Sequence, residues 1–254
     1  MSLKEARSNP RFCDISDKMK AFAAMGSDSP AIINSVKNRG YQVVSVPRFS
    51  LLSFPVSRHA DMVFSLIGKT VFSSVSYASE ACELFDALRG AGYTVVLDNA
   101  TDFASYPQEA RFNVLFCGGK LFGNLRAVSS EVLAFAEKCD IPFVHVNQGY
   151  AACNSAVCGK GIITSDPSIY TALMKNGVPC LRISSGSILL DGYDHGFIGG
   201  ASGYSAFDNT LYFCGDVSTH PDNAAIVDFA GEMGVKTVSL SGGPLIDIGG
   251  IAFF

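Results

Sequence analysis

Cys153, His195 and His220 are the residues of this sequence whose types and settings best suit chemistry on a small molecule. A cysteine thiolate is a nucleophile when a neighbouring base or cation lowers the pKa of its thiol, and His145 and Arg182 are candidates for that neighbour. His220 precedes a proline at a predicted helix start, where the helix dipole disfavours imidazolium and suits proton transfer or hydrogen bonding. Each also has a structural interpretation, as a buried strand thiol or as a capping or core histidine.

Acidic and polar side chains that could hold a substrate lie at strand ends and in loops. Asp98 and Asn147 directly follow predicted strands, Asp194 precedes one of the histidines, and Asp247 lies near the end of the sequence. Carboxylates bind cationic groups, so Asp98 or Asp247 would hold one. We assign Asp98, Asn147, Asp194 and Ser202 to substrate binding, and Asp247 joins Cys153 and the two histidines as a catalytic candidate.

The stretch 197–204 is the richest in small residues. Glycines there could let backbone amides approach and cradle an anion, or they could form a tight turn that needs positive φ. The stretch matches neither a phosphate-binding loop nor a Gly-x-Ser-x-Gly nucleophile elbow, so a nucleotide cofactor and a serine nucleophile are not favoured.

Composition excludes several classes of protein. The 254 residues are 48% hydrophobic and 17% charged, which is incompatible with a disordered chain. The net charge of −4 and the lack of a basic run argue against nucleic-acid binding, and no apolar run is long enough to span a membrane. The eight cysteines lack zinc-ligand spacing and a secretory signal is absent, so we expect free thiols in the cytoplasm and no metal or cofactor.

The elements that must position these residues recur along the chain. A helix is followed by a short β-branched strand five times, and a pair of strands split by a tight turn precedes each helix after the first. The predicted helix–strand pairs are 29–38 with 41–46, 78–89 with 92–97, 129–139 with 141–146, 167–176 with 177–183, and 221–233 with 234–240. The predicted strand pairs are 62–67 with 70–72, 112–117 with 120–122, 150–157 with 162–164, and 197–200 with 210–214.

The repeating unit is therefore strand, strand, helix, strand, and four complete units run from about residue 59 to 241. A fifth begins with two strands within 244–254, and the missing helix and strand are supplied by 29–46. We predict one α/β domain over 1–254: an irregular lead-in over 1–27, with helical character around 17–24, and a five-bladed β/α-propeller over 28–254 whose fifth unit is closed by both termini. An ordinary doubly wound α/β sheet is the alternative.

This repeat order resembles the pentein superfamily, the fold of guanidino-group-modifying enzymes. Three stretches, 147–153, 192–203 and 247–249, more narrowly resemble an uncharacterised bacterial branch of that fold. The resemblance implies an axial site at the loops that follow the last strand of each unit: 47–48, 98–99, 147–148, 184–185 and 241–243.

Catalytic penteins use a cysteine nucleophile in the closing unit, a histidine for proton transfer, and carboxylates that bind the guanidinium group. In this sequence Asp247 stands where that cysteine is expected, and no cysteine follows Cys214. Cys153, which follows an axial loop, is the candidate substitute. Two functions therefore stay open: a hydrolase or transferase acting on a small guanidino, amidino or related polar compound, and a non-catalytic module that binds a ligand or a protein.

Overall fold

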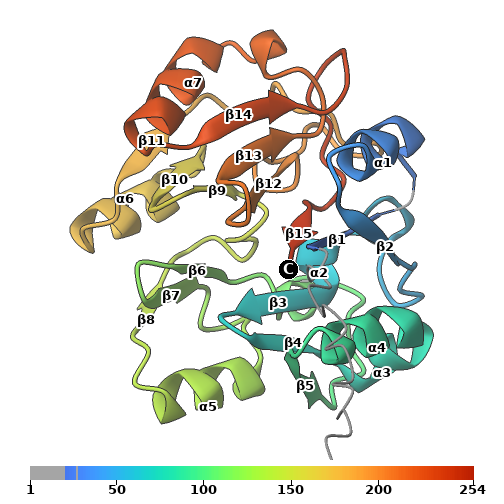
Figure 1. Ribbon diagram of the computed structural model, residues 1–254. Helices are drawn as coiled ribbons and strands as arrows, with labels where there is room; N and C mark the ends of the chain where they lie inside the picture. The colour runs from blue at the N-terminus through green and yellow to red at the C-terminus, as the bar shows by residue number, and fades with distance from the viewer. Residues whose placement is uncertain (1–20, 27) are drawn as a thin grey trace, which may run out of the picture.

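Five small sheets, each of three strands, carry the described chain. The structure is a computed structural model that describes residues 21–26 and 28–254 (Figure 1). The strands of the five sheets are β15 (Ala252–Phe253), β1 (Phe22–Gly26) and β2 (Gln42–Val46); β3 (Phe64–Ile67), β4 (Thr70–Ser74) and β5 (Thr94–Asp98); β6 (Leu115–Cys117), β7 (Lys120–Gly123) and β8 (Phe143–His145); β9 (Ser155–Cys158), β10 (Gly161–Thr164) and β11 (Cys180–Arg182); and β12 (Ser202–Ser205), β13 (Thr210–Phe213) and β14 (Lys236–Ser239).

All five sheets have the same topology. The first strand pairs antiparallel with the middle strand, and the middle strand pairs parallel with the last. A helical crossover joins the two parallel strands, as such a pair requires. The helices are α1 (Pro30–Lys37), α2 (Ala60–Val63), α3 (Val75–Glu80), α4 (Cys82–Gly90), α5 (Ser130–Lys138), α6 (Pro167–Lys175) and α7 (Asn223–Glu232), with short 3₁₀ turns η1 (Phe54–Val56), η2 (Gln108–Ala110) and η3 (Val217–Thr219). The predicted α/β fold of repeated strand–strand–helix–strand units is confirmed.

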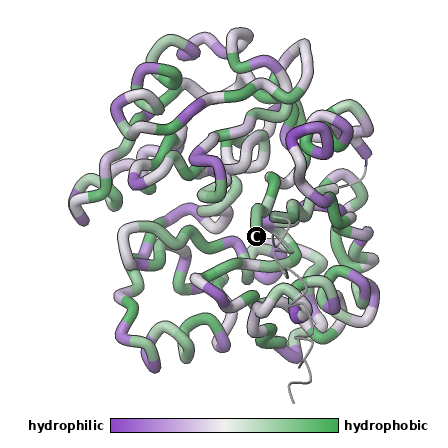
Figure 2. The backbone as a smooth tube through the Cα atoms, viewed as in Figure 1, coloured by the Kyte–Doolittle hydropathy of each residue, from purple (hydrophilic) through white to green (hydrophobic). Residues whose placement is uncertain are grey.

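The first strand of every sheet lies at the centre of the molecule. Residues of β3, β6, β9, β12 and β15 together line one central cavity, whereas the exposed residues of the sheets all lie on their last strands. In Figure 1 the sheets surround the central region that holds β15, and the longer helices lie at the periphery. Figure 2 shows the same gradient, with hydrophilic residues on α1 at the rim and hydrophobic residues on the central strands.

The lead-in prediction was wrong where it can be compared. Residues 1–20 and 27 lie outside the described part of the chain, but β1 occupies 22–26, within the predicted irregular and helical segment. This strand is the middle strand of the fifth sheet and is buried on both faces, so its alanines and methionine lack the alternation of a half-buried strand. The chain end therefore supplies one strand, β15, rather than two, because β1 already fills the second place.

The first strand of the fourth complete unit was also misplaced. It spans 202–205 rather than 197–200, so the glycine- and serine-rich stretch predicted as a turn is partly a strand. Gly199, Gly200 and Gly203 are not in the positive-φ region. Other parts of the chain pass close to them: a methyl group would overlap backbone carbonyls at Gly199 and Gly203 and a side chain at Gly200. The carbonyl at Gly203 is that of Ile251, in the neighbouring fifth unit.

A residue in the left-handed conformation lies between each of the last four long helices and the strand that follows it, as is common at helix ends. It is Gly92 after α4, Asp140 after α5, Gly177 after α6 and Gly234 after α7. The helices bury one face: Leu84, Phe85 and Leu88 of α4 are fully buried.

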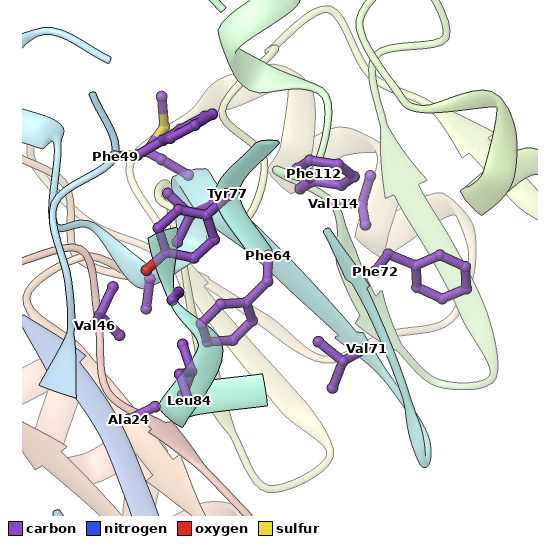
Figure 3. Close-up of a cluster of buried hydrophobic side chains, with 14 of the residues drawn as sticks. Ala24, Val46, Phe49, Phe64, Val71, Phe72, Tyr77, Leu84, Phe112 and Val114 are labelled. Carbon is purple, nitrogen blue, oxygen red and sulfur yellow. The ribbon is translucent and has the colours of Figure 1, made fainter. Parts of the chain in front are cut away.

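The core is divided among the sheets rather than gathered in one place. The largest cluster lies under β3, β4 and α4, where the ring of Phe49 packs edge-on against Tyr77 at 5.2 Å (Figure 3). The buried Tyr77 hydroxyl donates a hydrogen bond of 3.1 Å to the Pro47 carbonyl. Three smaller clusters fill the spaces between the remaining sheets.

The seven cysteines in the described residues are free, which agrees with the predicted free thiols. Cys117, Cys153, Cys158 and Cys214 are buried, while Cys82 and Cys139 are exposed. None of the described helices is both long and apolar enough to cross a membrane.

The close approach at Gly203 gives a stability test. We expect Gly203→Ala to lower the free energy of unfolding by about 1–3 kcal/mol, because the added methyl group must displace the Ile251 carbonyl. Gly231→Ala is the matched control: its methyl group meets open space in α7 and should raise stability by up to about 1 kcal/mol. Urea unfolding followed by circular dichroism measures both, and equal stabilities of the two variants would contradict the packing argument.

Candidate functional site

The residues at the centre of the molecule come from equivalent places in the five units. Each loop leaves the peripheral last strand of one sheet and returns to the central first strand of the next. Its final residues therefore reach the axis, while its first residues stay near the rim. The residues that arrive in this way are His59 and Asp61 before β3, Asn113 before β6, Cys153 before β9, His195 before β12 and Asp247 before β15.

Asn113 fixes the position of Cys153. Its Oδ1 accepts hydrogen bonds from the backbone N–H groups of Ala152, at 2.7 Å, and Cys153, at 3.1 Å. Its Nδ2 donates to the Asp61 carbonyl at 2.9 Å and to the Cys153 Sγ at 2.8 Å. One buried amide thus ties together loops from three units, and it holds the sulfur at a defined place.

Asp247 is buried and is held by backbone amides. Its Oδ2 accepts a hydrogen bond from the Phe197 N–H and its Oδ1 from the Gly249 N–H, both at 2.9 Å. A methyl group on Gly200 would overlap the carboxylate, so the absence of a side chain there makes room for it. The anion that the glycine-rich stretch accommodates is therefore a side chain of this chain.

His59 faces both buried carboxylates. Its Nδ1 lies 3.7 Å from Asp247 Oδ1 and 4.0 Å from Asp61 Oδ1. Gly249 makes this approach possible, because its φ is +78° and any side chain there would overlap His59. One imidazole therefore lies next to two carboxylates. Even when protonated, it can balance only one of their two negative charges.

The electrostatics of the cluster favour its protonated forms. Burial raises the pKa of Asp61 to about 6; the charge of Asp247 acts in the same direction, and His59 opposes it. Burial also raises the pKa of Asp247. The pKa of the Cys153 thiol is raised by burial first, and then by the negative charges of Asp61 and Asp247. A cation bound nearby would favour the ionised form of each of these groups and so lower all three pKa values.

A cavity of about 160 Å³ opens onto this cluster. Cys153, His59 and Asp247 lie buried in it, and Tyr193, half exposed, stands at its rim. The remaining lining residues are Val56, Met62, Glu109, Tyr150, Leu190, His195 and Phe197. The Tyr150 hydroxyl donates a hydrogen bond to Glu109. We call this space the cysteine cavity; its lining contains carboxylates and histidines but no lysine or arginine.

Three of the predicted catalytic residues, Cys153, His195 and Asp247, share the cysteine cavity. His220 lies elsewhere, between η3 and α7, where its Nδ1 accepts a hydrogen bond of 3.1 Å from the Asp222 N–H and burial lowers its pKa. This is the capping position that the sequence allowed as an alternative.

The four predicted substrate-binding residues do not line the cysteine cavity. Asp98 pairs with Arg111 at 2.9 Å, and Asp194 is exposed. Asn147 lines a separate polar pocket, and Ser202 lines the central cavity with its Oγ donating to the Ile198 carbonyl at 2.7 Å. Asp98 and Asn147 stand where their loops begin, which is why they remain near the rim. Their roles stay predictions.

His145 and Arg182 are absent from the lining as well. His145 accepts a hydrogen bond from the Leu125 N–H and lines the pocket that holds Asn147, and Arg182 is exposed on the peripheral β11. The histidine near Cys153 is His59, which sequence reasoning did not select. Its signal was its position a few residues before a first strand, a position that Asp61 and Asn113 share.

Comparison with known proteins places the chain in a family. Residues 25–252 match the family described as "Family of unknown function (DUF6873)". The chain belongs to this family. No curated protein matches the chain at a significant level.

Solved structures of similar fold extend the comparison. The N-terminal domain of ArgZ, an arginine dihydrolase from cyanobacteria, aligns with a TM-score of 0.53 at 12% identity over 86% of this chain and 90% of that one. DDAH from Pseudomonas aeruginosa, a cysteine-to-serine mutant with citrulline, gives 0.52 at 9% identity over 88% and 86%. The amidinotransferase SxtG from Microseira wollei gives 0.50 at 13% identity over 82% and 72%. The DUF6873 chain has the fold of the pentein superfamily, as its sequence predicted.

The raised pKa of Asp61 predicts a pH dependence of stability. Ionising this carboxyl costs folding free energy as the pH rises from about 4, where it titrates in the unfolded chain, to about 6, where it titrates in the folded one. Asp61→Asn removes that cost. The variant should therefore gain stability relative to the unchanged protein, by on the order of 1–3 kcal/mol, between pH ~4 and ~7 in urea unfolding.

Asp166→Asn is the matched control with the opposite sign. Burial opposes the shift, but hydrogen bonds donated by Ser168, Ile169 and Gln148 keep the pKa of Asp166 below its usual value. The Asp166→Asn variant should lose stability relative to the unchanged protein as the pH rises through the range below about 4. Parallel pH profiles for the two variants would refute the assignment of Asp61.

Proposed function

We propose that this protein is a hydrolase or transferase that acts on a small guanidino or amidino compound in the cysteine cavity, with Cys153 as the nucleophile. The observation that carries the proposal is the placement of the Cys153 thiol beside two buried carboxylates, Asp61 and Asp247. A planar cation bound there would meet an attacking sulfur and the carboxylate of Asp247, with the charge of Asp61 on the far side of the thiol. The free cysteines fit a reducing cytoplasm, which we propose as the location.

Recognition in this proposal rests on charge. Asp247 already accepts two backbone hydrogen bonds, and each of its oxygens keeps a lone pair for a guanidinium N–H. Glu109 adds a third carboxylate near the rim. Charge-assisted hydrogen bonds to carboxylates suit the planar, forked guanidinium group and leave a neutral urea poorly served.

A bound cation also addresses the raised pKa of Cys153. The substrate would neutralise Asp247, one of the two carboxylates that disfavour a thiolate, so the pKa of the thiol would fall when the substrate is in place. Asp61, whose carboxylate faces the Cys153 thiol, is available to receive the thiol proton. Activation would then depend on the substrate, and the free enzyme would hold an unreactive thiol.

The proposed step balances as follows. Cys153 Sγ bonds to the amidinium carbon, the bond from that carbon to the leaving nitrogen breaks, and the thiol proton leaves with the amine. His59 and His195, both in the cavity, are the groups placed to pass that proton. Attack by water on the sulfur-linked carbon then restores the thiol and gives a urea derivative and a proton; attack by a second amine gives a transferred amidino group.

A non-catalytic ligand-binding role is the second candidate. The hydrogen bond from Asn113 to Sγ and the raised pKa of Cys153 are equally suited to a structural thiol. A cysteine with that role would not react faster with a cationic electrophile than with a neutral one.

Labelling of Cys153 separates the two candidates. We expect chloroacetamidine, a cationic electrophile, to alkylate Cys153 at least about tenfold faster than neutral chloroacetamide, after each rate is divided by that for the denatured chain. Mass spectrometry locates the label. Cys158, buried in β9 with its pKa raised to about 11 by burial, is the matched control and should show no such preference.

Cys153→Ser should abolish the preferential labelling, and Cys158→Ser should preserve it. If the charged and neutral reagents label Cys153 at equal normalised rates, no group near the thiol binds a cation. The ligand-binding role is then the better description.

Binding of methylguanidine tests recognition apart from chemistry. We expect calorimetry to show methylguanidine binding at least about tenfold more tightly than its neutral isostere methylurea. Asp247→Asn should weaken methylguanidine by about 10- to 100-fold, because one charge-assisted interaction is lost. Asp228→Asn, at an exposed carboxylate of α7 outside the cavity, should leave the affinity unchanged. Equal affinities for the two compounds would exclude a cationic substrate.

A further inference from the structure

A second cavity, of about 250 Å³, lies among the central strands of all five sheets. We call it the axial cavity. It is a different space from the cysteine cavity: the two share no lining residue, and Asp61 lines the axial cavity while standing beside Cys153 of the other.

Unpartnered polar atoms converge on this cavity. Among the described residues, the hydroxyls of Ser65 and Ser155 are buried without a hydrogen-bond partner, and the buried carboxylate oxygens of Asp61 have no donor nearby other than the weak one of the Cys153 thiol and the distant His59. The two serines are 6% and 5% exposed, and all three residues line the axial cavity. Buried polar groups are nearly always paired in folded proteins, so a concentration of unpaired ones indicates a missing partner.

Other buried serines show that this condition is local. Ser202, which lines the same cavity, donates its hydroxyl hydrogen to the Ile198 carbonyl, and Ser73 on β4 donates to the Val63 carbonyl at 2.7 Å. Ser65 lies on β3 and Ser155 on β9, from two different units. The unpaired hydrogen-bonding groups are therefore confined to the part of the cavity where β3 and β9 approach Asp61.

The lining defines the chemistry of the missing partner. Asp61 is the one charged residue in the lining, and its negative charge disfavours an anionic ligand. A neutral ligand would leave the Asp61 carboxylate without a counter-charge. One carboxylate and two hydroxyls are too few oxygens for a dehydrated metal ion, but they match the three N–H donors of an ammonium group. Leu66, Phe116, Val157 and Phe253 supply apolar wall for a short chain.

We propose that the axial cavity is a second ligand site, which takes a small primary ammonium ion with a short apolar chain, and that its occupant acts on Cys153 through Asp61. The ammonium group donates to Asp61, Ser65 and Ser155, and the chain lies along the apolar wall. Asp61 links the two cavities because its charge acts both on a ligand in the axial cavity and on the Cys153 thiol.

The coupling has a defined sign. Asp61 faces His59, Asp247 and Cys153, and its negative charge is one cause of the raised pKa of the Cys153 thiol. An ammonium ion paired with Asp61 cancels that charge, so the thiol ionises more readily and reacts faster. The effect does not require Cys153 to be a catalytic nucleophile, so the ammonium site stands or falls separately from the proposed function.

Calorimetry with the full chain tests the site. Propylammonium chloride should bind saturably with one ligand per chain, while 1-propanol, which lacks the charge, and tetramethylammonium, which lacks N–H donors, should not. Ser65→Ala and Ser155→Ala should each weaken propylammonium by about tenfold, as loss of a hydrogen bond to a charged group does. Ser73→Ala, which removes a buried hydroxyl on the strand next to β3, is the matched control and should leave the affinity unchanged.

Alkylation of Cys153 by chloroacetamide tests the coupling. At about pH 8, below the raised pKa of the thiol, saturating propylammonium should accelerate the reaction several-fold. Asp61→Asn should abolish the acceleration while leaving the thiol accessible to the reagent.

Three results would overturn the proposal. Equal binding of K⁺ would make this an inorganic cation site. Affinity that is insensitive to both serine variants would place the ligand elsewhere, and competition between propylammonium and methylguanidine would place it in the cysteine cavity. Failure of methylguanidine to bind at all would refute the proposed function and leave the ammonium site untouched.

Discussion

The pairing of β1 with β15 is the constraint on which the rest of the structure depends. It joins two ends of the described chain in the fifth sheet, with Ala23 opposite Phe253 and Ala24 opposite Ala252. Phe22 and Phe254 exchange backbone hydrogen bonds next to this pair, and their rings stack at 4.8 Å. When this sheet is formed, the segment that leads into β15 runs past the axis. Asp247 is then buried beside residues that lie far away in sequence.

The repeat could be predicted from sequence because its signals are local. Helix faces, helix-stopping glycines and β-branched strands depend on neighbours a few residues away, and these signals placed the sheets and helices well. The failures fall where tertiary burial overrides local preference. The fully buried β1 lacks a period-two pattern, and the glycines at 199–203 are small because segments distant in sequence pass close to them, which no local rule detects.

The candidate site was predicted in part for the same reason. Cys153 and Asp247 were found by residue type and by the closing position in the repeat, but Asp98 and Asn147 were placed on the axis because they begin the correct loops. A loop that starts at the rim reaches the axis only at its other end. His59, Asp61 and Asn113 stand at that other end, and their residue types alone did not distinguish them from ordinary surface residues.

The dependence on β15 also has a consequence for synthesis of the chain. The β1–β2 pair and the helix between them can form early, but the second edge of β1 stays unpaired until Ala252 and Phe253 have been synthesised. Asp247 is synthesised just before that strand, so the glycine-lined recess beside Gly200 has no carboxylate to hold until then. An exposed strand edge of buried composition is an aggregation hazard while it waits. The fold therefore gains the Asp247 carboxylate and covers the second edge of β1 at nearly the same point of synthesis.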